Sequence, residues 1–275
     1  MSLFCCPICK ESLHINSSGY HCANGHCFDR AAAGYTHLLP ANRKHSKQPG
    51  DDQAMVAARS AFLEKGYYAP LRETLCNRIC GDLADISAPA ILDSGCGEGY
   101  YTAGIYQTLV QLGRQVQLAG IDISKFAVRR AAKRVPEGEF AVASVYHLPI
   151  KENCIHALTN IFSPLCVEEF RRVLQPGGYF YYVVPSAQHL WEMKEVLYDS
   201  PYPNPVRTEQ YEGFQWLTAI PVREQISLTS PEDIMALFGM TPYAWKTPKA
   251  GIQRLSERGS LTTQIGFDIH VYLRH

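Results

Sequence analysis

The segment that follows Pro89 alternates short apolar runs with stretches of helical periodicity. The apolar runs, each about as long as a strand, cover residues 90–92, 116–121, 140–143, 155–161 and 179–184. The helical stretches between them cover residues 100–112, 125–134 and 167–174. This alternation is typical of a parallel sheet with helices on both faces. The sequence therefore predicts an α/β fold built on a doubly wound sheet.

Further elements are expected on either side of this core. Asp52 is a candidate N-cap for a helix that ends at Gly66, and Pro70 opens a second helix that extends to residue 83. After His189 we expect a further helix, then a strand near 225–228, a helix over 231–238 and a closing strand over 267–273. Residues 53–275 are therefore assigned to one large domain.

The N-terminal segment has the spacing of a zinc site. The pattern C-x2-C-x12-C-x3-H is formed by Cys6, Cys9, Cys22 and His26. Zinc prefers four nitrogen or sulfur ligands in a tetrahedron, and a site with four protein ligands is structural rather than catalytic. We expect one structural zinc ion per chain. Two alternatives stay open: the cysteines could be ordinary reduced thiols, or the adjacent Cys5 or Cys27 could replace a ligand.

The first 52 residues are polar and locally basic. Residues 1–40 bury too little apolar surface to fold alone, so a metal or a neighbour must stabilise them. Residues 41–52 form a basic linker with Arg43, Lys44 and Lys47. The whole chain balances 26 Lys and Arg against 26 Asp and Glu, so nucleic-acid binding would depend on local patches such as this linker. The alternative is a solvated loop without a partner.

The cellular setting is predicted from cysteine content and hydropathy. The chain has ten cysteines and no N-terminal apolar segment of the secretory type, which favours a reducing, cytoplasmic compartment. No apolar run approaches the roughly 20 residues that span a bilayer, so we expect no membrane partner.

A glycine-rich loop follows the first strand of the large domain. The sequence Asp-x-Gly-x-Gly-x-Gly comprises Asp93, Gly95, Gly97 and Gly99. The spacing differs from the dinucleotide pattern G-x-G-x-x-G, and a carboxylate before the first glycine would repel a pyrophosphate. These features favour a cationic ligand. Asp122, at the end of the next strand, is placed to accept hydrogen bonds from two ribose hydroxyls.

Over residues 89 to about 185, these features resemble the class I S-adenosylmethionine-dependent methyltransferases, which have a Rossmann-like sheet. The resemblance implies that Asp93 and the loop residues Gly95, Gly97, Glu98 and Gly99 hold the methionine part of the cofactor. It also implies that Asp122 binds the ribose, and that the backbone near Ala143 and Ser144 binds the adenine.

Nearly the whole chain resembles one family, the 23S rRNA guanine-N1 methyltransferases of the RlmA/TlrB type. The resemblance rests on the N-terminal Cys-Pro-x-Cys knuckle, Gly66-Tyr67-Tyr68, the run from Cys96 to Tyr101, Ser163-Pro164 and the segment from Pro185 to His189. It implies a homodimer that methylates a guanine in a domain II hairpin of 23S rRNA, with zinc in the recognition domain. It further implies that the contacts to S-adenosylmethionine include Tyr68, Gly99, Tyr100, Asp122 and His189.

Two residues are candidates for catalysis. Asn160 could hydrogen-bond the guanine edge while Phe162 stacks on the base, although the family keeps no fixed polar residue at the Asn160 position and an ordinary strand-end role is equally open. His189 could accept the N1 proton, but a cofactor contact is the preferred interpretation. The target base must leave its pairing partner before its N1 can react.

Two other functions compete with RNA methylation. A small-molecule methyltransferase could use the zinc module as a structural lid, and an RNA-binding adaptor could keep the cofactor fold without catalysis. The basic zinc module argues against the former, and the intact glycine loop with both Asp93 and Asp122 argues against the latter.

Overall fold

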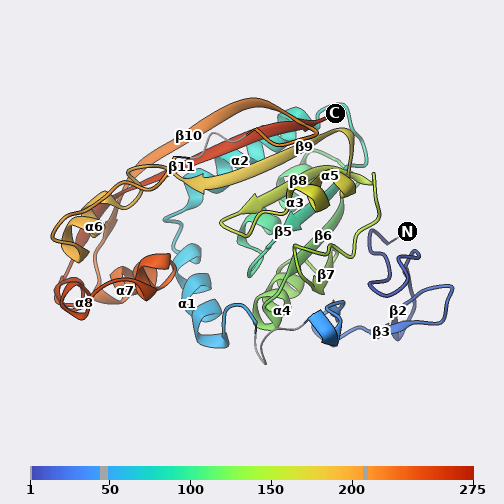
Figure 1. The fold of residues 1–275 in the computed structure, drawn as a ribbon, viewed down its shortest axis with the longest axis horizontal. Helices are drawn as coiled ribbons and strands as arrows, with labels where there is room; N and C mark the ends of the chain where they lie inside the picture. The colour runs from blue at the N-terminus through green and yellow to red at the C-terminus, as the bar shows by residue number, and fades with distance from the viewer. Residues whose placement is uncertain (1, 44–48, 207–209) are drawn as a thin grey trace.

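The fold is described from a computed structural model that covers residues 2–43, 49–206 and 210–275. An eight-stranded sheet runs through these residues in the order β10-β11-β9-β8-β5-β6-β7-β4 (Figure 1). Its central strands are β5 (Ala90–Ser94), β6 (Gln117–Asp122), β7 (Glu139–Val142), β8 (Ile155–Ile161) and β9 (Leu174–Pro185). These five strands are parallel to one another. The predicted doubly wound α/β fold is confirmed.

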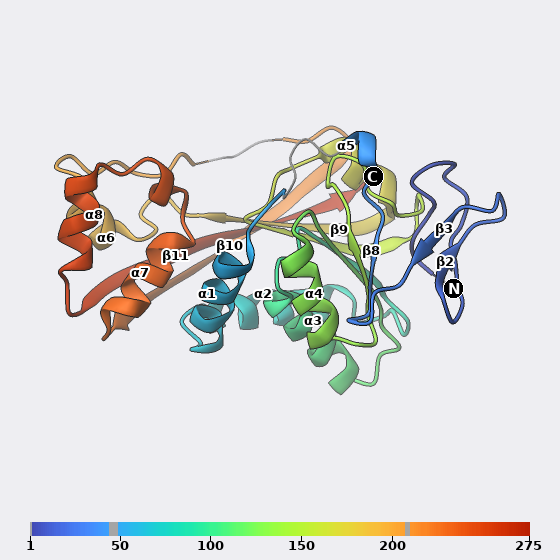
Figure 2. The same ribbon diagram turned by 90° about the horizontal axis from the view of Figure 1, so that it is seen from below.

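One face of the sheet is covered by helices that the sequence predicted. They are α2 (Ala69–Asp82), α3 (Tyr100–Gln111) and α4 (Lys125–Arg134). Ile91, Leu118 and Phe140 point toward these helices and share one apolar core with them. Figure 2 shows α3 and α4 on one side of the sheet and α5 (Val167–Val173) on the other. The alternation of side chains along each strand thus provides apolar groups to both faces.

The N-terminal segment covers the other face beside α5. It contains a small antiparallel sheet of β1 (His14–Ile15), β2 (Gly19–His21) and β3 (Cys27–Asp29). Phe4, Leu13 and Tyr20 are buried in one cluster with Leu92 and Ile121 of the main sheet. The connection from β7 to β8, residues 143–154, contains no helix. The zinc segment therefore fills a place that a helix could otherwise occupy.

The first strand of the main sheet also comes from the N-terminal segment. β4 (Tyr35–His37) pairs in parallel with β7 at the edge of the sheet, a pairing that the sequence did not indicate. The chain then passes through a 3-10 turn, η1 (Ala41–Arg43). Lys44 and Lys47 of the basic linker lie outside the described residues. The boundaries 1–40, 41–52 and 53–275 stay a prediction.

Helix α1 (Gln53–Glu64) begins and ends as its sequence predicts. The Asp52 carboxylate accepts a hydrogen bond from Met55 N at 2.9 Å, and Gly66 has the left-handed φ of 80° that suits a helix end. Lys65 and Tyr67, just after the helix, contact the Asp233 carboxylate at 2.5 and 3.0 Å. These contacts attach α1 to the C-terminal part of the chain.

The C-terminal part forms an arm that extends past the sheet. Strands β10 (Phe214–Leu228) and β11 (Leu261–Arg274) pair along their whole length, and only residues 267–273 of β11 pair with β9. In this arm α6 (Trp191–Leu197) packs against β11 and α7 (Pro231–Gly239) against β10 (Figure 1). The 3-10 helix η2 (Pro242–Trp245) packs against α7, and α8 (Lys249–Ser256) packs against α6 and α7.

Both arm strands are longer than expected. The strands predicted near 225–228 and over 267–273 are only parts of β10 and β11, and α8 was not predicted. β10 lies at the sheet edge, where Pro221, Arg223 and Glu224 are exposed. Exposed polar residues and a proline weaken the strand pattern in the sequence, but they are tolerated at an edge. None of the helices among the described residues has the length and apolar character needed to cross a membrane.

Candidate cofactor pocket and zinc site

The four predicted zinc ligands converge on one point. The ligand atoms of Cys6, Cys9, Cys22 and His26 all lie within 4.8 Å of one another. His26 Nδ1 is 3.6 Å from Cys6 Sγ and 3.3 Å from Cys22 Sγ, and Cys9 Sγ is 3.7 Å from Cys22 Sγ. A tetrahedral zinc with Zn–S bonds of about 2.3 Å places two sulfur atoms about 3.8 Å apart. The donor set and its spacing fit a structural zinc ion.

The adjacent cysteines do not belong to this cluster. Cys27 is exposed and its Sγ lies 3.6 Å from Gly25 O, while Cys5 is buried and its backbone N donates to Pro149 O at 2.9 Å. The pKa of Cys9 is lowered to about 6, chiefly by a hydrogen bond from a backbone N–H near Glu11. This hydrogen bond favours the thiolate form that zinc requires. The cluster thus contains His26 and not Cys27, and the roles of its members as ligands stay predictions.

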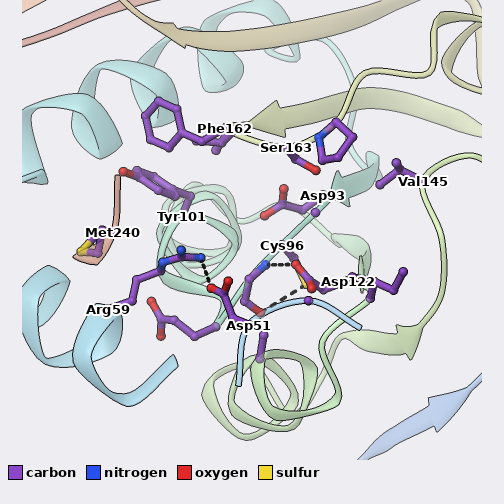
Figure 3. A pocket seen from close by; sticks show the side chains of 18 of the residues that line it. Asp51, Arg59, Asp93, Cys96, Tyr101, Asp122, Val145, Phe162, Ser163 and Met240 are labelled. Atoms are coloured by element: carbon purple, nitrogen blue, oxygen red, sulfur yellow. Dashed lines mark hydrogen bonds and ion pairs between the residues drawn. The ribbon is translucent and has the colours of Figure 1, made fainter. Parts of the chain in front are cut away.

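A cavity of about 930 Å³ lies at the carboxyl ends of β5, β6 and β8 (Figure 3). This volume is in the range of sites for cofactors and drug-sized ligands. Its walls contain these residues expected to bind the cofactor: Tyr68, Asp93, Gly95, Gly97, Glu98, Tyr100, Asp122, Ser144 and His189. Gly99 is not part of the wall. The pocket brings these residues together, and their individual roles in binding stay predictions.

Asp93 is a buried carboxylate at the end of β5. Its oxygens accept hydrogen bonds from Thr102 Oγ1 at 2.5 Å and Thr159 Oγ1 at 2.9 Å. Burial raises the pKa of Asp93 to about 6, although both hydroxyls oppose the shift. A cation in the pocket would favour the ionised form of this carboxylate. Asp93 is therefore suited to a ligand with a positively charged group.

Asp122 orders the glycine loop as well as facing the pocket. One of its oxygens accepts from Gly97 N at 3.0 Å and the other from Ser124 N at 2.8 Å. Burial raises the pKa of Asp122, and these two backbone N–H groups oppose the shift. Each carboxylate oxygen has a further lone pair for a ligand hydroxyl. The arrangement fits the predicted recognition of a ribose.

The glycines of the loop are required for different reasons. All three have positive φ: 84° at Gly95, 54° at Gly97 and 86° at Gly99. A Cβ on Gly95 would overlap the Ser163 side chain, and one on Gly99 would lie 2.9 Å from Ala131 Cα. A Cβ on Gly97 would meet no atom within 4 Å. Gly97 therefore leaves open space beside the cavity, whereas the other two allow close packing of the protein itself.

Glu98 has a partner within the protein. It is 2% exposed, and one of its oxygens accepts from Arg134 at 2.5 Å, while the other has no partner among the described residues. Burial raises its pKa and Arg134 opposes the shift. The uncommitted oxygen leaves Glu98 able to accept a hydrogen bond from a ligand.

Aromatic rings line the wall between the loop and the arm. Tyr68 packs edge-on against Phe267, with ring centroids 5.0 Å apart, and Tyr101 packs edge-on against Tyr100 at 5.1 Å. The hydroxyls of Tyr100 and Tyr101 are buried and have no hydrogen-bond partner among the described residues. Burial raises the pKa of Tyr68, so this phenol is neutral at physiological pH.

His189 is held as a neutral ring. Gly266 N donates to its Nδ1 at 3.2 Å, and burial, followed by the charge of Lys194, lowers its pKa to about 3. Because Nδ1 accepts, the proton of the neutral ring lies on Nε2, which is a donor. This arrangement supports a binding contact for His189 rather than proton acceptance.

The two residues expected to meet the guanine lie in different surroundings. Asn160 is fully buried, its Nδ2 donates to Ser94 O at 3.3 Å and Pro164 O at 3.0 Å, and it does not line the pocket. Phe162 lines the pocket, is 46% exposed and has the unusual φ of 52°. Asn160 thus holds the loop that presents Phe162.

Several lining residues were not predicted. Asp51 and Arg59, from the linker end and α1, form an ion pair at 2.7 Å across one side of the pocket (Figure 3). Asn204, Met240 and Tyr243 come from the arm. These residues carry no sequence motif, and only tertiary packing brings them to the pocket.

Two family models match the chain. The model described as RlmA, N-terminal, a zinc ribbon, matches residues 4–47, and a methyltransferase domain model matches residues 87–216. The segment matched first contains all four zinc ligands, and the second contains the glycine loop and Asp122.

Curated relatives share the same combination. The 23S rRNA (guanine(748)-N(1))-methyltransferase of Streptomyces fradiae is 37% identical over 194 residues, which is 70% of this chain and 66% of that protein. Proteins provisionally named 23S rRNA (guanine-N(1)-)-methyltransferases are 31% identical in Micromonospora griseorubida, over 94% of both chains, and 31% identical in Bacillus subtilis, over 99% of this chain and 98% of that one. The chain therefore belongs to the family of 23S rRNA guanine-N1 methyltransferases, with an RlmA-type zinc ribbon ahead of an S-adenosylmethionine-dependent methyltransferase domain.

Proposed function

We propose that this protein transfers a methyl group from S-adenosylmethionine to N1 of a guanine in a domain II hairpin of 23S rRNA. The observation that carries the proposal is one pocket in which Asp93 and Asp122 face the cavity beside the open space at Gly97. The relatives whose names specify rRNA guanine N1 supply the substrate class.

Different residues are proposed to bind S-adenosylmethionine and the guanine base. Bound S-adenosylmethionine supplies an electrophilic methyl group. Asp93 would balance the positive charge of the cofactor, and Asp122 would fix its ribose by accepting hydrogen bonds. The exposed ring of Phe162, next to Tyr101 at a centroid distance of 6.5 Å, offers a surface for a flipped base.

Positioning is the main contribution of the protein to this reaction. An orientation that aligns the base nitrogen with the methyl group removes much of the entropic barrier. His189, neutral and with Nε2 as donor, provides a directional contact but no strong base.

The zinc ribbon and the basic linker are proposed to bind the RNA backbone. Lys44 and Lys47 belong to this proposal from sequence alone. Contacts to phosphate orient an RNA without reading its sequence, and each contact adds to the salt dependence of binding. Substitution of Arg43, Lys44 and Lys47 by alanine should weaken binding of the hairpin and flatten the plot of log affinity against log salt. An unchanged slope would refute the RNA role of the linker.

We also propose that the protein acts in the cytoplasm as a homodimer. The support for the dimer is the family resemblance, and two zinc ribbons could then hold one hairpin. Sedimentation equilibrium of the zinc-loaded chain, alone and with the hairpin RNA, tests this arrangement: a monomer under both conditions would refute it.

The function is tested by incubating the protein with labelled S-adenosylmethionine and 23S rRNA from a strain that lacks the modification. Label should enter a fragment that contains the domain II hairpin. The variant Asp93→Asn should incorporate less label than the wild type, because it lacks the carboxylate proposed to face the cofactor. Label in a small-molecule extract but not in rRNA would instead support a small-molecule methyltransferase.

A further inference from the structure

Among the residues that the structure describes, Lys194, on α6, is a buried cation without a carboxylate partner. Its side chain is fully buried, and Nζ donates to Tyr202 O and to Asn204 Oδ1, both at 2.8 Å. Nζ also lies 5.2 Å from the ring centroids of Tyr202 and Tyr243. The ion pairs found in the described parts of the chain do not include Lys194. Buried lysines usually have a counterion, so a buried lysine that has none among the described residues is unusual.

The partners of Lys194 form part of the pocket wall. Asn204 and Tyr243 both line the cavity, and Asn204 Oδ1 also accepts from Tyr243 OH at 3.1 Å. Asn204 Nδ2 donates to Ser186 O at 2.9 Å. Three hydrogen bonds thus fix the Asn204 amide, and one side chain separates the ammonium group from the cavity.

The charge of Lys194 also affects a second residue of the wall. It contributes to the lowered pKa of His189, after burial. The hydrogen bond from Nζ to Asn204, which lines the cavity, places Lys194 behind the same wall.

Resting on the proposed function, we propose that Lys194 is a positioning residue that acts through Asn204 and Tyr243 to favour the deprotonated form of the bound guanine. In the reaction the N1–H bond breaks and the proton leaves to water. The N1 electron pair then forms a bond to the methyl carbon, while the methyl–sulfur bond breaks and its electron pair stays on sulfur. A positive charge at the wall stabilises the negative charge that N1 and O6 share after the proton has left.

Among the described residues, the carboxylates near α6 have partners other than Lys194. The described ionisable residues on α6, on the elements that pack against it and in the adjoining segments include Tyr198, Tyr202, Tyr243, His189, Glu192, Glu195, Asp199, Arg223, Lys249, Arg254, Asp268, His270 and Arg274. Of these four carboxylates, Glu192 is bound by Gln264 N and Thr263 Oγ1, and Glu195 accepts from Trp191. Asp199 pairs with Arg254, and Asp268 pairs with Arg223. Burial alone lowers the pKa of Lys194, and no carboxylate contributes to that shift.

The test is the pH dependence of single-turnover methylation, with rRNA and S-adenosylmethionine both saturating. Lys194→Met removes the charge but keeps most of the volume. We expect about a tenfold slower rate at pH 7, which corresponds to a loss of about 1.4 kcal/mol of transition-state stabilisation. The difference from wild type should shrink as pH rises, because N1 then loses its proton without help. Lys249→Met, on an exposed position of α8, is the matched control and should match wild type.

A second variant changes the charge at the same place. Asn204→Asp keeps an oxygen acceptor for Lys194 and Tyr243, loses the Nδ2 donor to Ser186 O and places a negative charge beside the ammonium group. It should show the same loss at pH 7 and the same recovery at high pH, even if Lys194→Met fails to fold. S-adenosylmethionine affinity, measured by calorimetry, is determined for both variants so that the rates are compared at saturating cofactor.

The outcomes distinguish this inference from the proposed function. A loss of the same factor at every pH, or Asn204→Asp with the wild-type rate at pH 7, would overturn the role of Lys194 while wild-type methylation stands. Absence of 1-methylguanosine after incubation with the wild-type protein would overturn the proposed function and this inference with it.

Discussion

Replacement of Asp93 by asparagine should stabilise the free protein while it weakens cofactor binding. The carboxylate is 2% exposed, and burial raises its pKa to about 6 from an ordinary value of 3.8. An acid whose pKa is raised by folding stabilises the folded state fully only below its unfolded pKa, and this stability is lost as pH rises through the folded pKa. At pH 7 the carboxylate is ionised, so the folded protein bears the cost of a buried charge.

The size of this cost follows from the shift. A shift of about two pKa units corresponds to about 3 kcal/mol at pH 7, and the linkage relation leaves about 1.6 kcal/mol at pH 5. Asparagine retains an oxygen acceptor, and the hydroxyls of Thr102 and Thr159 can turn to accept from its NH2 group. We therefore expect Asp93→Asn to increase the free energy of unfolding by up to about 3 kcal/mol at pH 7, and by less at pH 5.

Binding should change in the opposite direction. Loss of one charged hydrogen bond reduces affinity by roughly 1.5–3 kcal/mol, or about 10- to 100-fold. In the wild type, protonation of Asp93 competes with a cationic ligand, so the affinity for S-adenosylmethionine should fall as pH drops below about 6.

Urea unfolding of the cofactor-free protein at pH 5 and pH 7, with calorimetric titration of S-adenosylmethionine, measures both effects. Asp85→Asn, at an exposed position, is the matched control and should change neither quantity. A variant that is less stable than wild type at pH 7, or a stability gain that is equal at both pH values, would refute the argument from burial.

Three further predictions concern the zinc site and the cofactor loop. Cys22→Ser should abolish stoichiometric zinc binding and lower the melting temperature of the whole chain, because the ribbon covers one face of the main sheet. Cys27→Ser should retain the zinc and the melting temperature. Atomic absorption measures the zinc content, and calorimetry measures the melting temperature. Gly95→Ala should destabilise the protein by about 1–3 kcal/mol in urea unfolding, since its φ of 84° and the adjacent side chain exclude a methyl group; a neutral result would contradict the geometry of the loop. Arg134→Met should cost about 3–5 kcal/mol at pH 7 by leaving Glu98 buried without its partner, and this cost should decrease as pH falls and Glu98 becomes protonated.

The parts of the structure that depend on local sequence were predictable. The spacing of Cys6, Cys9, Cys22 and His26 restricts one short segment, so it identified the metal cluster without knowledge of the fold. The glycine loop was equally local, since positive φ at three positions demands glycine. The choice between His26 and Cys27 required the structure, because neighbouring residues share nearly the same spacing.

Features that depend on long-range packing were not predictable. β4 joins the main sheet through pairing with β7, about 100 residues later in the chain, and its three residues carry no distinctive pattern. Asn204 and Tyr243 reach the pocket only because the arm folds back against α1. Asn160 showed the opposite problem: its position near the end of a strand resembles that of a substrate-binding residue, but its amide Nδ2 donates to the backbone oxygens of Ser94 and Pro164.

The central claim is that this chain methylates N1 of a guanine in 23S rRNA, and nucleoside mass spectrometry with mapping of reverse-transcription stops tests it most directly. Unmodified 23S rRNA incubated with the zinc-loaded protein and S-adenosylmethionine should yield 1-methylguanosine, together with a new stop at one guanine of the domain II hairpin. Since N1 takes part in base pairing, its methylation blocks the reverse transcriptase. A methyl group on another atom, on another nucleotide outside this hairpin, or on no RNA nucleoside would contradict the account.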